Sequence, residues 1–134
     1  MTETVIWENE YVTLKFHEDT KIVHHECHQY LFGDRFRECL TRGVATLEKY
    51  GAKKWLSDDR KTSALPPDDA NWSEVEWAPD AFEKGWRYWA IVLPERAIGK
   101  MAVDRIIGDP GINAQLRIQV FSDPNAAYEW LAHQ

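Results

Sequence analysis

Two adjacent carboxylates and a guanidinium, Asp58, Asp59 and Arg60, follow a short apolar segment near the middle of the chain. A carboxylate pair can act as general acid and general base when one member is buried. The preceding segment, Ala52–Asp58, is predicted to be a strand, however, and neighbouring side chains on a strand point to opposite faces. In the alternative, structural interpretation one aspartate caps the next turn and the other pairs with Arg60. We favour the structural interpretation over a hydrolase-like use of the pair.

A second group of reactive side chains is the run His24, His25, Cys27 and His28. Imidazole and thiolate are common zinc ligands. On a strand His25 and Cys27 share one face, whereas His24 and His28 share the other and lie roughly 13 Å apart. Because a closed zinc site needs four converging ligands, no metal is predicted, and only His25 and Cys27 are kept as candidates for one. The alternative is a polar sheet face, either free or at a homodimer contact.

Tryptophan is abundant, with seven residues in 134. Trp72 and Trp77 lie in a proline-containing connection, and Trp86 and Trp89 lie at the start of the next predicted strand. These side chains either line an apolar pocket beside the carboxylates or pack the connection onto the sheet, which is the commoner use of large aromatic residues. Both interpretations hold together if the core is incompletely filled.

Other catalytic patterns are missing from the sequence. Cys27 is expected in mid-strand and Cys39 in mid-helix, with no adjacent base. There is no Gly-x-Ser-x-Gly motif and no glycine-rich phosphate loop. Lys100, near the start of a later helix, could attract an anion, although we favour a solvated loop as its explanation. The sequence therefore predicts no catalytic residue and no cofactor.

Five predicted strands alternate with helices and must position these groups. The strands are Tyr11–Phe16, Lys21–His28, Ala52–Asp58, Tyr88–Leu93 and Leu116–Val120. The helices are Gly33–Tyr50, short pieces between Lys61 and Lys84 broken by prolines, Ile98–Ile107 and Pro124–Leu131. A hairpin followed by this alternation predicts a single α/β domain over residues 1–134, with a mostly parallel, mixed five-stranded sheet and right-handed crossovers.

Composition narrows the classes of partner. The net charge is −6, and no basic stripe exists to neutralise phosphates, so nucleic acid is not an expected partner. No apolar run approaches the roughly 20 residues of a membrane span. The first residues lack the basic and apolar regions of a signal peptide. With two cysteines and no disulfide framework, a cytoplasmic location is expected.

Several motifs in order resemble one known family, the small SpoIIAA-like domains of STAS/SEC14 type. They are KWLSDDR at Lys54–Arg60, GWRYWAIVLP at Gly85–Pro94, GKM at Gly99–Met101, and the ending Phe121–Leu131. The resemblance extends over nearly the full chain. It implies a mostly parallel sheet with helices packed beside it, and it is closest to a subfamily without an assigned activity.

The resemblance implies three kinds of role: phosphoserine-switched regulators, modules of anion transporters, and lipid-binding proteins with an apolar cleft. The switch serine of the regulators lies after the third strand, in a motif resembling Asp-Ser-Ser/Thr-Gly. Here Asp58 and Asp59 are followed by Arg60, and no glycine follows Ser63. The departure argues against a phosphoserine switch at this position.

The predicted function is that of a non-enzymatic binding or regulatory module. Its site is expected at the carboxyl ends of the third and fourth strands, where open α/β sheets bind ligands. The candidate site residues are Asp58, Asp59, Arg60, Trp72, Trp77 and Lys100. The first alternative is a carrier of a small apolar or lipid-like ligand in a tryptophan-lined cleft, and the last is the hydrolase-like enzyme. The expected partner is an unknown protein or a small apolar ligand, and a homodimer through an edge strand is a further alternative.

Overall fold

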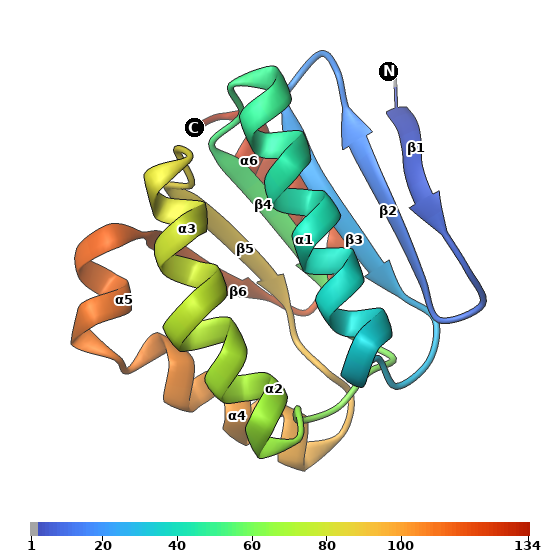
Figure 1. The fold of residues 1–134 in the computed structure, drawn as a ribbon, viewed down its shortest axis with the longest axis vertical. Coiled ribbons are helices and arrows are strands. Elements are labelled where there is room, and N and C mark those ends of the chain that lie inside the picture. The colour runs from blue at the N-terminus through green and yellow to red at the C-terminus, as the bar shows by residue number, and fades with distance from the viewer. Residues whose placement is uncertain (1–2) are drawn as a thin grey trace.

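The computed structural model describes residues 3–134 and contains one six-stranded mixed sheet whose strands lie side by side in chain order. The strands are β1 (Glu3–Glu8), β2 (Val12–His17), β3 (Ile22–Cys27), β4 (Lys54–Asp58), β5 (Tyr88–Val92) and β6 (Arg117–Phe121). The first three are antiparallel to one another, and β3 to β6 run parallel (Figure 1). The predicted α/β class is confirmed.

The prediction of five strands is wrong, because β1 adds a sixth at the edge of the sheet. Most of β1 is exposed, including Val5 at 53 %, and its pairing with β2 shifts register between Val5 and Trp7. An exposed edge strand does not need the alternation of apolar and polar residues that reveals a half-buried strand. The sequence signal for β1 is therefore weak.

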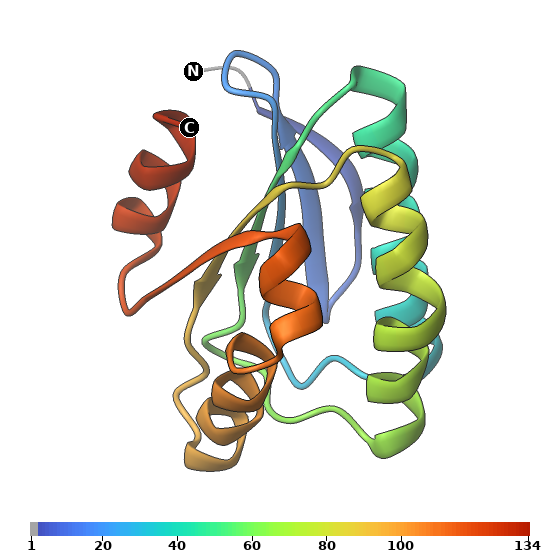
Figure 2. The ribbon, with the colours of Figure 1, turned by 90° about the vertical axis from the view of Figure 1, so that its left-hand side faces the viewer.

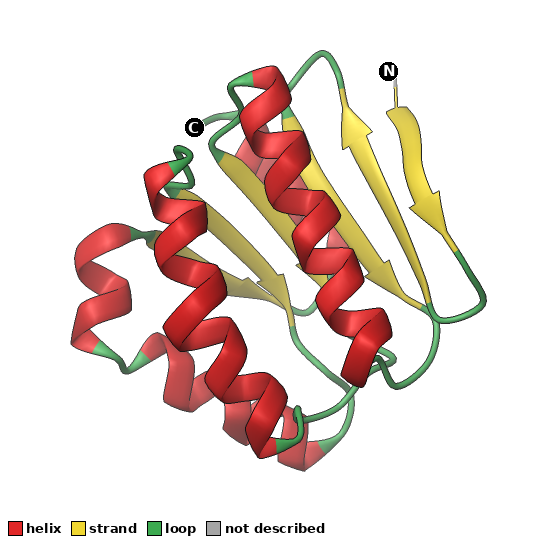
Figure 3. Cartoon of the chain, in the orientation of Figure 1, coloured by secondary structure: helices red, strands yellow, loops and turns green. Residues whose placement is uncertain are grey.

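The helices cover both faces of the sheet, as the red ribbons of Figure 3 show. They are α1 (Gly33–Tyr50), α2 (Pro67–Trp72), the π-helical η1 (Ser73–Trp77), α3 (Ala78–Glu83), α4 (Ala97–Ile107), α5 (Pro110–Gln115) and α6 (Pro124–Ala132). With the sheet seen nearly edge-on, α1 and the α2–α3 run lie on one side and α6 on the other (Figure 2). None of the helices within residues 3–134 has both the length and the apolar character needed to cross a bilayer.

Strand order explains this distribution of helices. Adjacent parallel strands joined by right-handed crossovers place their connecting helices on the same face when the order runs steadily in one direction. The order β3-β4-β5-β6 does so, and the connections between these strands carry α1 to α5. Since α6 follows the last strand, no crossover constrains it, and it packs on the opposite face.

Each face of the sheet has its own core. Side chains of β4 alternate, so Trp55 joins the large core under α1, while Leu56 joins a smaller core with Ala127 and Leu131 of α6. Trp55 and Leu56 are 2 % and 0 % exposed. The parallel strands β4 and β5 are thus apolar on both faces, as expected of covered central strands.

The long helix α1 matches its prediction at both ends. Its buried face includes Phe36, Leu40, Val44 and Leu47, which recur at helical spacing. Gly51 ends it in the left-handed conformation with φ 61°, and its N–H bonds back to carbonyls of the last turn. The helix packs against β1, β2 and β3, and its Gly43 contacts Trp55 of β4.

The connection between β4 and β5 differs from the prediction of separate short pieces. Residues 67–83 form one uninterrupted helical run in which the five residues of η1 are π-helical. The backbone N–H of Ala78 bonds to the carbonyl of Ser73, five residues back, directly before Pro79. Since Pro79 has no N–H to donate, the wider turn lets the chain pass the proline without ending the helix.

Candidate functional site

The end of β4 separates the two carboxylates. Trp55, Ser57 and Asp59 line a cavity on the face covered by α1. Leu56 packs on the opposite face, and the two-residue period puts Asp58 on that face as well. Asp58 and Asp59 therefore do not face a common substrate, as strand geometry predicts.

Asp58 and Arg60 form a bidentate ion pair outside the cavity. Arg60 donates from Nε to Oδ1 at 2.9 Å and from Nη2 to Oδ2 at 2.8 Å. Asp58 Oδ1 also accepts the backbone N–H of Arg60 at 3.4 Å. The structural interpretation divided capping and pairing between the two aspartates, but Asp58 performs both. The reason is proximity: Arg60 follows it by two residues, and both donors reach the same carboxylate.

His25 of β3 links Asp59 to Trp55. Its Nε2 lies 2.8 Å from Asp59 Oδ1, and its Nδ1 accepts the indole N–H of Trp55 at 3.0 Å. Because an indole nitrogen only donates, Nδ1 carries no proton, and the neutral ring holds its proton on Nε2. His25 thus donates to the Asp59 carboxylate as an uncharged imidazole.

His25, Cys27 and Asp59 are the one group of three or more candidate metal ligands found in residues 3–134, with ligand atoms within 4.8 Å of one another. Metal at His25 Nε2 would move the ring proton to Nδ1, where it would face the N–H of Trp55. Burial, followed by the Asp59 carboxylate, raises the pKa of the Cys27 thiol, whereas a metal ligand is a thiolate. A metal ion at this donor set would therefore have to displace the Cys27 proton and disrupt the hydrogen bond from Trp55 to His25.

The same contacts disfavour nucleophilic chemistry in the cavity. Cys27 Sγ lies 3.7 Å from Asp59 Oδ1 as a donor, which keeps its proton in place. Ser57 Oγ accepts the indole N–H of Trp89 at 2.9 Å. His25 cannot take a proton at Nδ1 without losing the hydrogen bond from Trp55. Outside the cavity wall, burial raises the pKa of Cys39 to about 12. Neither Cys27 nor Ser57 is therefore arranged as a nucleophile beside a free base.

The cavity encloses about 150 Å³ between the sheet, α1, the α2–α3 run and the α4–α5 segment. Its polar end consists of His25, Cys27, Ser57, Asp59 and Thr62, which come from β3, β4 and the residues just after β4. The rest of the wall is almost entirely apolar. Its larger apolar side chains are Leu31, Phe36, Leu40, Trp55, Leu65, Trp77, Phe82, Trp86, Trp89, Ile106, Ile112 and Leu116.

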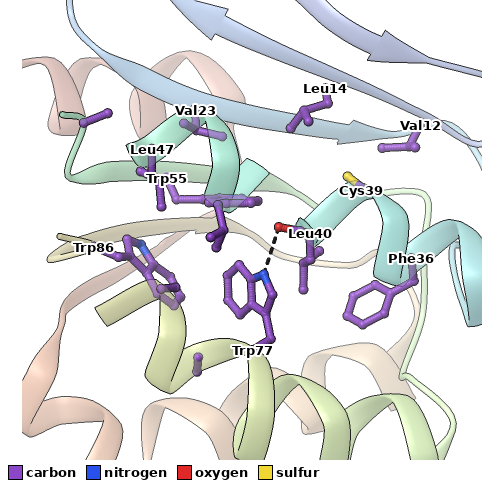
Figure 4. Packing of buried hydrophobic residues seen from close by; sticks show 14 of the residues in the cluster. Val12, Leu14, Val23, Phe36, Cys39, Leu40, Leu47, Trp55, Trp77 and Trp86 are labelled. Carbon is purple, nitrogen blue, oxygen red and sulfur yellow. Dashed lines mark hydrogen bonds between the residues drawn. The ribbon is translucent and has the colours of Figure 1, made fainter. Parts of the chain in front are cut away.

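Four tryptophans form a continuous wall of this cavity. Ring centroids are 5.3 Å apart for Trp55 and Trp77, 5.1 Å for Trp77 and Trp86, and 5.3 Å for Trp86 and Trp89, all edge to face. Figure 4 shows Trp77 between the sheet and its own helix, with its indole nitrogen aimed at the Leu40 carbonyl 2.8 Å away. Trp86 donates to the Tyr88 carbonyl at 3.1 Å. Since every indole N–H of the wall has a protein acceptor, the rings offer only their carbon surfaces to a ligand.

The rim of the cavity combines loop and helix residues. After β4, Ser63 and Leu65 are half-buried. In the π-helical turn, Ser73 is half-buried and Glu74 is exposed. Ser73 and Trp77, the first and last residues of η1, both line the cavity. The Asp59 side chain is 21 % exposed at this rim. A small molecule would therefore meet Asp59 from the solvent side.

The structure brings only two of the six predicted site residues to the cavity, Asp59 and Trp77. Trp72 lies outside it, with Phe36 at its edge and Arg37 over its ring. Lys100 is exposed on α4. Asp58 and Arg60 are bound to each other on the far face.

Sequence reasoning missed Ser57 and Thr62, although a signal for Ser57 exists. Counting back two residues from Asp59 reaches Ser57, and the parallel register pairs Ser57 with His25. If the two strands had been predicted to be neighbours, the alternation of side chains along each strand would have placed His25, Ser57 and Asp59 together on one face. Ile106 and Ile112 carry no such signal, because their contribution depends on how the α4–α5 segment returns over the sheet.

Two other histidines form a buried pair on the α6 face. His17 Nε2 lies 3.0 Å from His24 Nδ1, and the His17 ring meets the edge of Tyr128. His17 Nδ1 and His24 Nε2 are buried without a hydrogen-bond partner among the described residues. Burial is the main cause that lowers the pKa of both imidazoles. These rings are held neutral, away from the cavity.

Comparison with known proteins adds no relative: no protein-family model, no curated protein and no solved structure matches the chain.

Proposed function

We propose that this protein is a non-enzymatic binding module that holds a small, mostly apolar ligand in the tryptophan-walled cavity. The observation that carries the proposal is a cavity of about 150 Å³ whose wall is mostly apolar and contains a small group of polar side chains from the ends of β3 and β4. Apolar cavities of about this size accept benzene-sized molecules. A pocket with few convergent polar groups is the usual form of a small-molecule site.

Membership of the SpoIIAA-like (STAS/SEC14-type) domains is part of the proposal. The hairpin of β2 and β3, followed by parallel strands that alternate with helices, supports it. Among the roles that this resemblance implies, the apolar cleft of lipid-binding relatives is nearest to the cavity described above. A regulatory role would then depend on ligand occupancy rather than on a phosphoserine, and a cytoplasmic location fits two free, buried cysteines.

A homodimer is a second proposal, made for the edge strand β1. This strand has an unpaired side, and Val5 is 53 % exposed. Edge strands can pair with a second copy of the same chain. Sedimentation equilibrium tests this proposal, and a monomer at all concentrations up to about 100 μM would count against it.

The ligand proposal is tested with toluene as the probe. We expect saturable changes in tryptophan fluorescence and in the methyl NMR signals of Leu40 and Ile112 when toluene is added. Native mass spectrometry of the purified protein checks for a ligand acquired in the cell. If toluene changes neither the fluorescence nor the methyl signals, the proposed function is wrong.

A cavity-filling variant provides the matched comparison. Ala78 lines the cavity at its α3 side and is 9 % exposed, so Ala78→Leu should fill space that the probe needs. Ala45→Leu adds the same atoms at an exposed position of α1. We expect Ala78→Leu to weaken toluene binding about tenfold or more, a difference of roughly 1.4 kcal/mol, and Ala45→Leu to leave it unchanged. Equal effects of both substitutions on toluene binding would indicate that toluene binds outside the cavity.

A further inference from the structure

The charge of the cavity narrows the chemistry of its ligand. The 21 residues that line it include Asp59 and Glu74 and contain no lysine or arginine. The nearest guanidinium, in sequence, is Arg60, and it is bound to Asp58 on the other face of the sheet. His25 is uncharged in the arrangement described above. Among the described residues, neither carboxylate of this cavity forms an ion pair with a lysine or an arginine.

Asp59 has hydrogen-bonding capacity left for a ligand. Both contacts made by described residues, from His25 Nε2 and from Cys27 Sγ, fall on Oδ1. Oδ2 receives no hydrogen bond from residues 3–134, and the side chain is 21 % exposed at the rim. A carboxylate offers about four acceptor positions, so Oδ2 can accept a donor from a bound molecule.

The remaining wall favours a cation over a neutral donor. Electron-rich ring faces attract cations, tryptophan most strongly, and the attraction grows where water is excluded. Trp55, Trp77, Trp86 and Trp89 all line this cavity. Each of their indole N–H groups already donates to a protein acceptor: to His25, to a backbone carbonyl or to Ser57. No free indole N–H therefore points its positive end at a bound cation.

We infer that the ligand of this cavity is a small amine whose ammonium group binds Asp59 while its apolar body packs against the tryptophan wall. This inference depends on the proposed function, since it assigns the class of molecule that the cavity holds. The ammonium donates to Asp59 Oδ2, and Ser57 and Thr62 offer hydroxyl oxygens at the same end. The size of the cavity limits the apolar part to about one aromatic ring.

Three probes of nearly equal shape test the inference: benzylamine, which is a cation at pH 7, benzyl alcohol and toluene. Dissociation constants are measured by NMR titration of the methyl groups that line the cavity. We expect benzylamine to bind about tenfold or more tightly than either neutral probe, because hydrogen bonds to a charged group are the stronger ones. Because benzyl alcohol can donate a hydrogen bond but carries no charge, it shows how much of the affinity for benzylamine comes from the charge.

The outcomes distinguish the inference from the function on which it depends. If toluene and benzyl alcohol bind as tightly as benzylamine, the amine inference is wrong and the apolar binding function stands. If none of the three binds, both fail. These wild-type measurements decide the matter even if a variant of Asp59 does not fold.

The variant Asp59→Asn tests whether Asp59 causes the preference for benzylamine over the neutral probes. The amide oxygen that this substitution introduces can still accept the N–H of His25, so the fold should survive, and thermal unfolding checks that it does. We expect the preference for benzylamine over toluene to fall to about twofold or less. Asp68→Asn removes the same charge from an exposed position of α2 and should leave the preference unchanged. An undiminished preference in Asp59→Asn would overturn the assignment to Asp59.

Discussion

Gly43 of α1 lies directly against the indole ring of Trp55 on β4. A Cβ atom at position 43 would lie 2.6 Å from Cζ3 of that ring and still closer to Cη2. The glycine lets the helix approach the sheet closely enough to pack against the outer atoms of the Trp55 ring, which is 2 % exposed. This contact also fixes the ring whose N–H determines the tautomer of His25.

Gly43→Ala should therefore destabilise the protein, although glycine to alanine usually stabilises a helix interior. We expect the free energy of unfolding to fall by about 2 kcal/mol or more, because overpacking forces the ring or the helix to move. Gly108→Ala is the control, since φ there is −86° and the nearest atom to a new Cβ is 3.4 Å away. Urea denaturation measures both. A stabilised Gly43→Ala variant would contradict the close contact.

Arg60→Met should be destabilising because it leaves the buried Asp58 carboxylate without its partner. We expect a loss of about 2 kcal/mol, less than for a fully buried pair since Arg60 is 37 % exposed. The control Arg42→Met breaks a pair whose partners are 45 % and 48 % exposed and should cost about 0.5 kcal/mol or less. Adding Asp58→Asn to Arg60→Met should recover part of the loss, and no recovery would indicate that packing explains the effect.

His25 should be a neutral imidazole with its proton on Nε2. Long-range proton–nitrogen NMR spectra distinguish the two ring nitrogens, and at pH 7 we expect an unprotonated Nδ1. The reason is the indole N–H of Trp55, which points at Nδ1 from 3.0 Å. Trp55→Phe removes that donor and should allow both tautomers. Protonation of Nδ1 in the wild-type protein would disprove the proposed network.

Stability should fall as the pH drops below about 6.5. Burial lowers the pKa of His17 and His24 in the fold from the ordinary 6.5, so the unfolded chain binds more protons below that pH. Acidification favours the state that binds more protons, which here is the unfolded state. The two neutral histidines therefore contribute their full stabilisation above about pH 6.5 and progressively less below it.

The measurement for these histidines is urea denaturation at pH 7.5, 6.5 and 5.5. We expect the midpoint to change little between pH 7.5 and 6.5 and to fall between pH 6.5 and 5.5. The variant His24→Phe should flatten the dependence, whereas the control His133→Gln, at the exposed end of α6, should not. A midpoint that is constant or rises on acidification would show that the pair is not held neutral.

Local patterns were sufficient to predict most elements. Helical spacing of Phe36, Leu40, Val44 and Leu47 with Gly51 behind them predicted α1, and the structure confirms it. The exposed strand β1 and the helical passage through Pro79 could not be predicted in this way. Only Ile6 and Trp7 of β1 pack against the core, so this strand lacks a clear alternation, and a π turn depends on the neighbours against which it packs.

The sequence alone determined that Asp58 and Asp59 point to opposite faces, because side-chain alternation is a property of any strand. Only the tertiary structure decided which of them faces the aromatic cavity, since that depends on the side of the sheet to which the right-handed crossovers bring α1 to α5. The contact of Asp59 with His25 likewise required β3 and β4 to pair in parallel. Trp55 and Trp77, distant in sequence, meet because the sheet and the α2–α3 run close on each other.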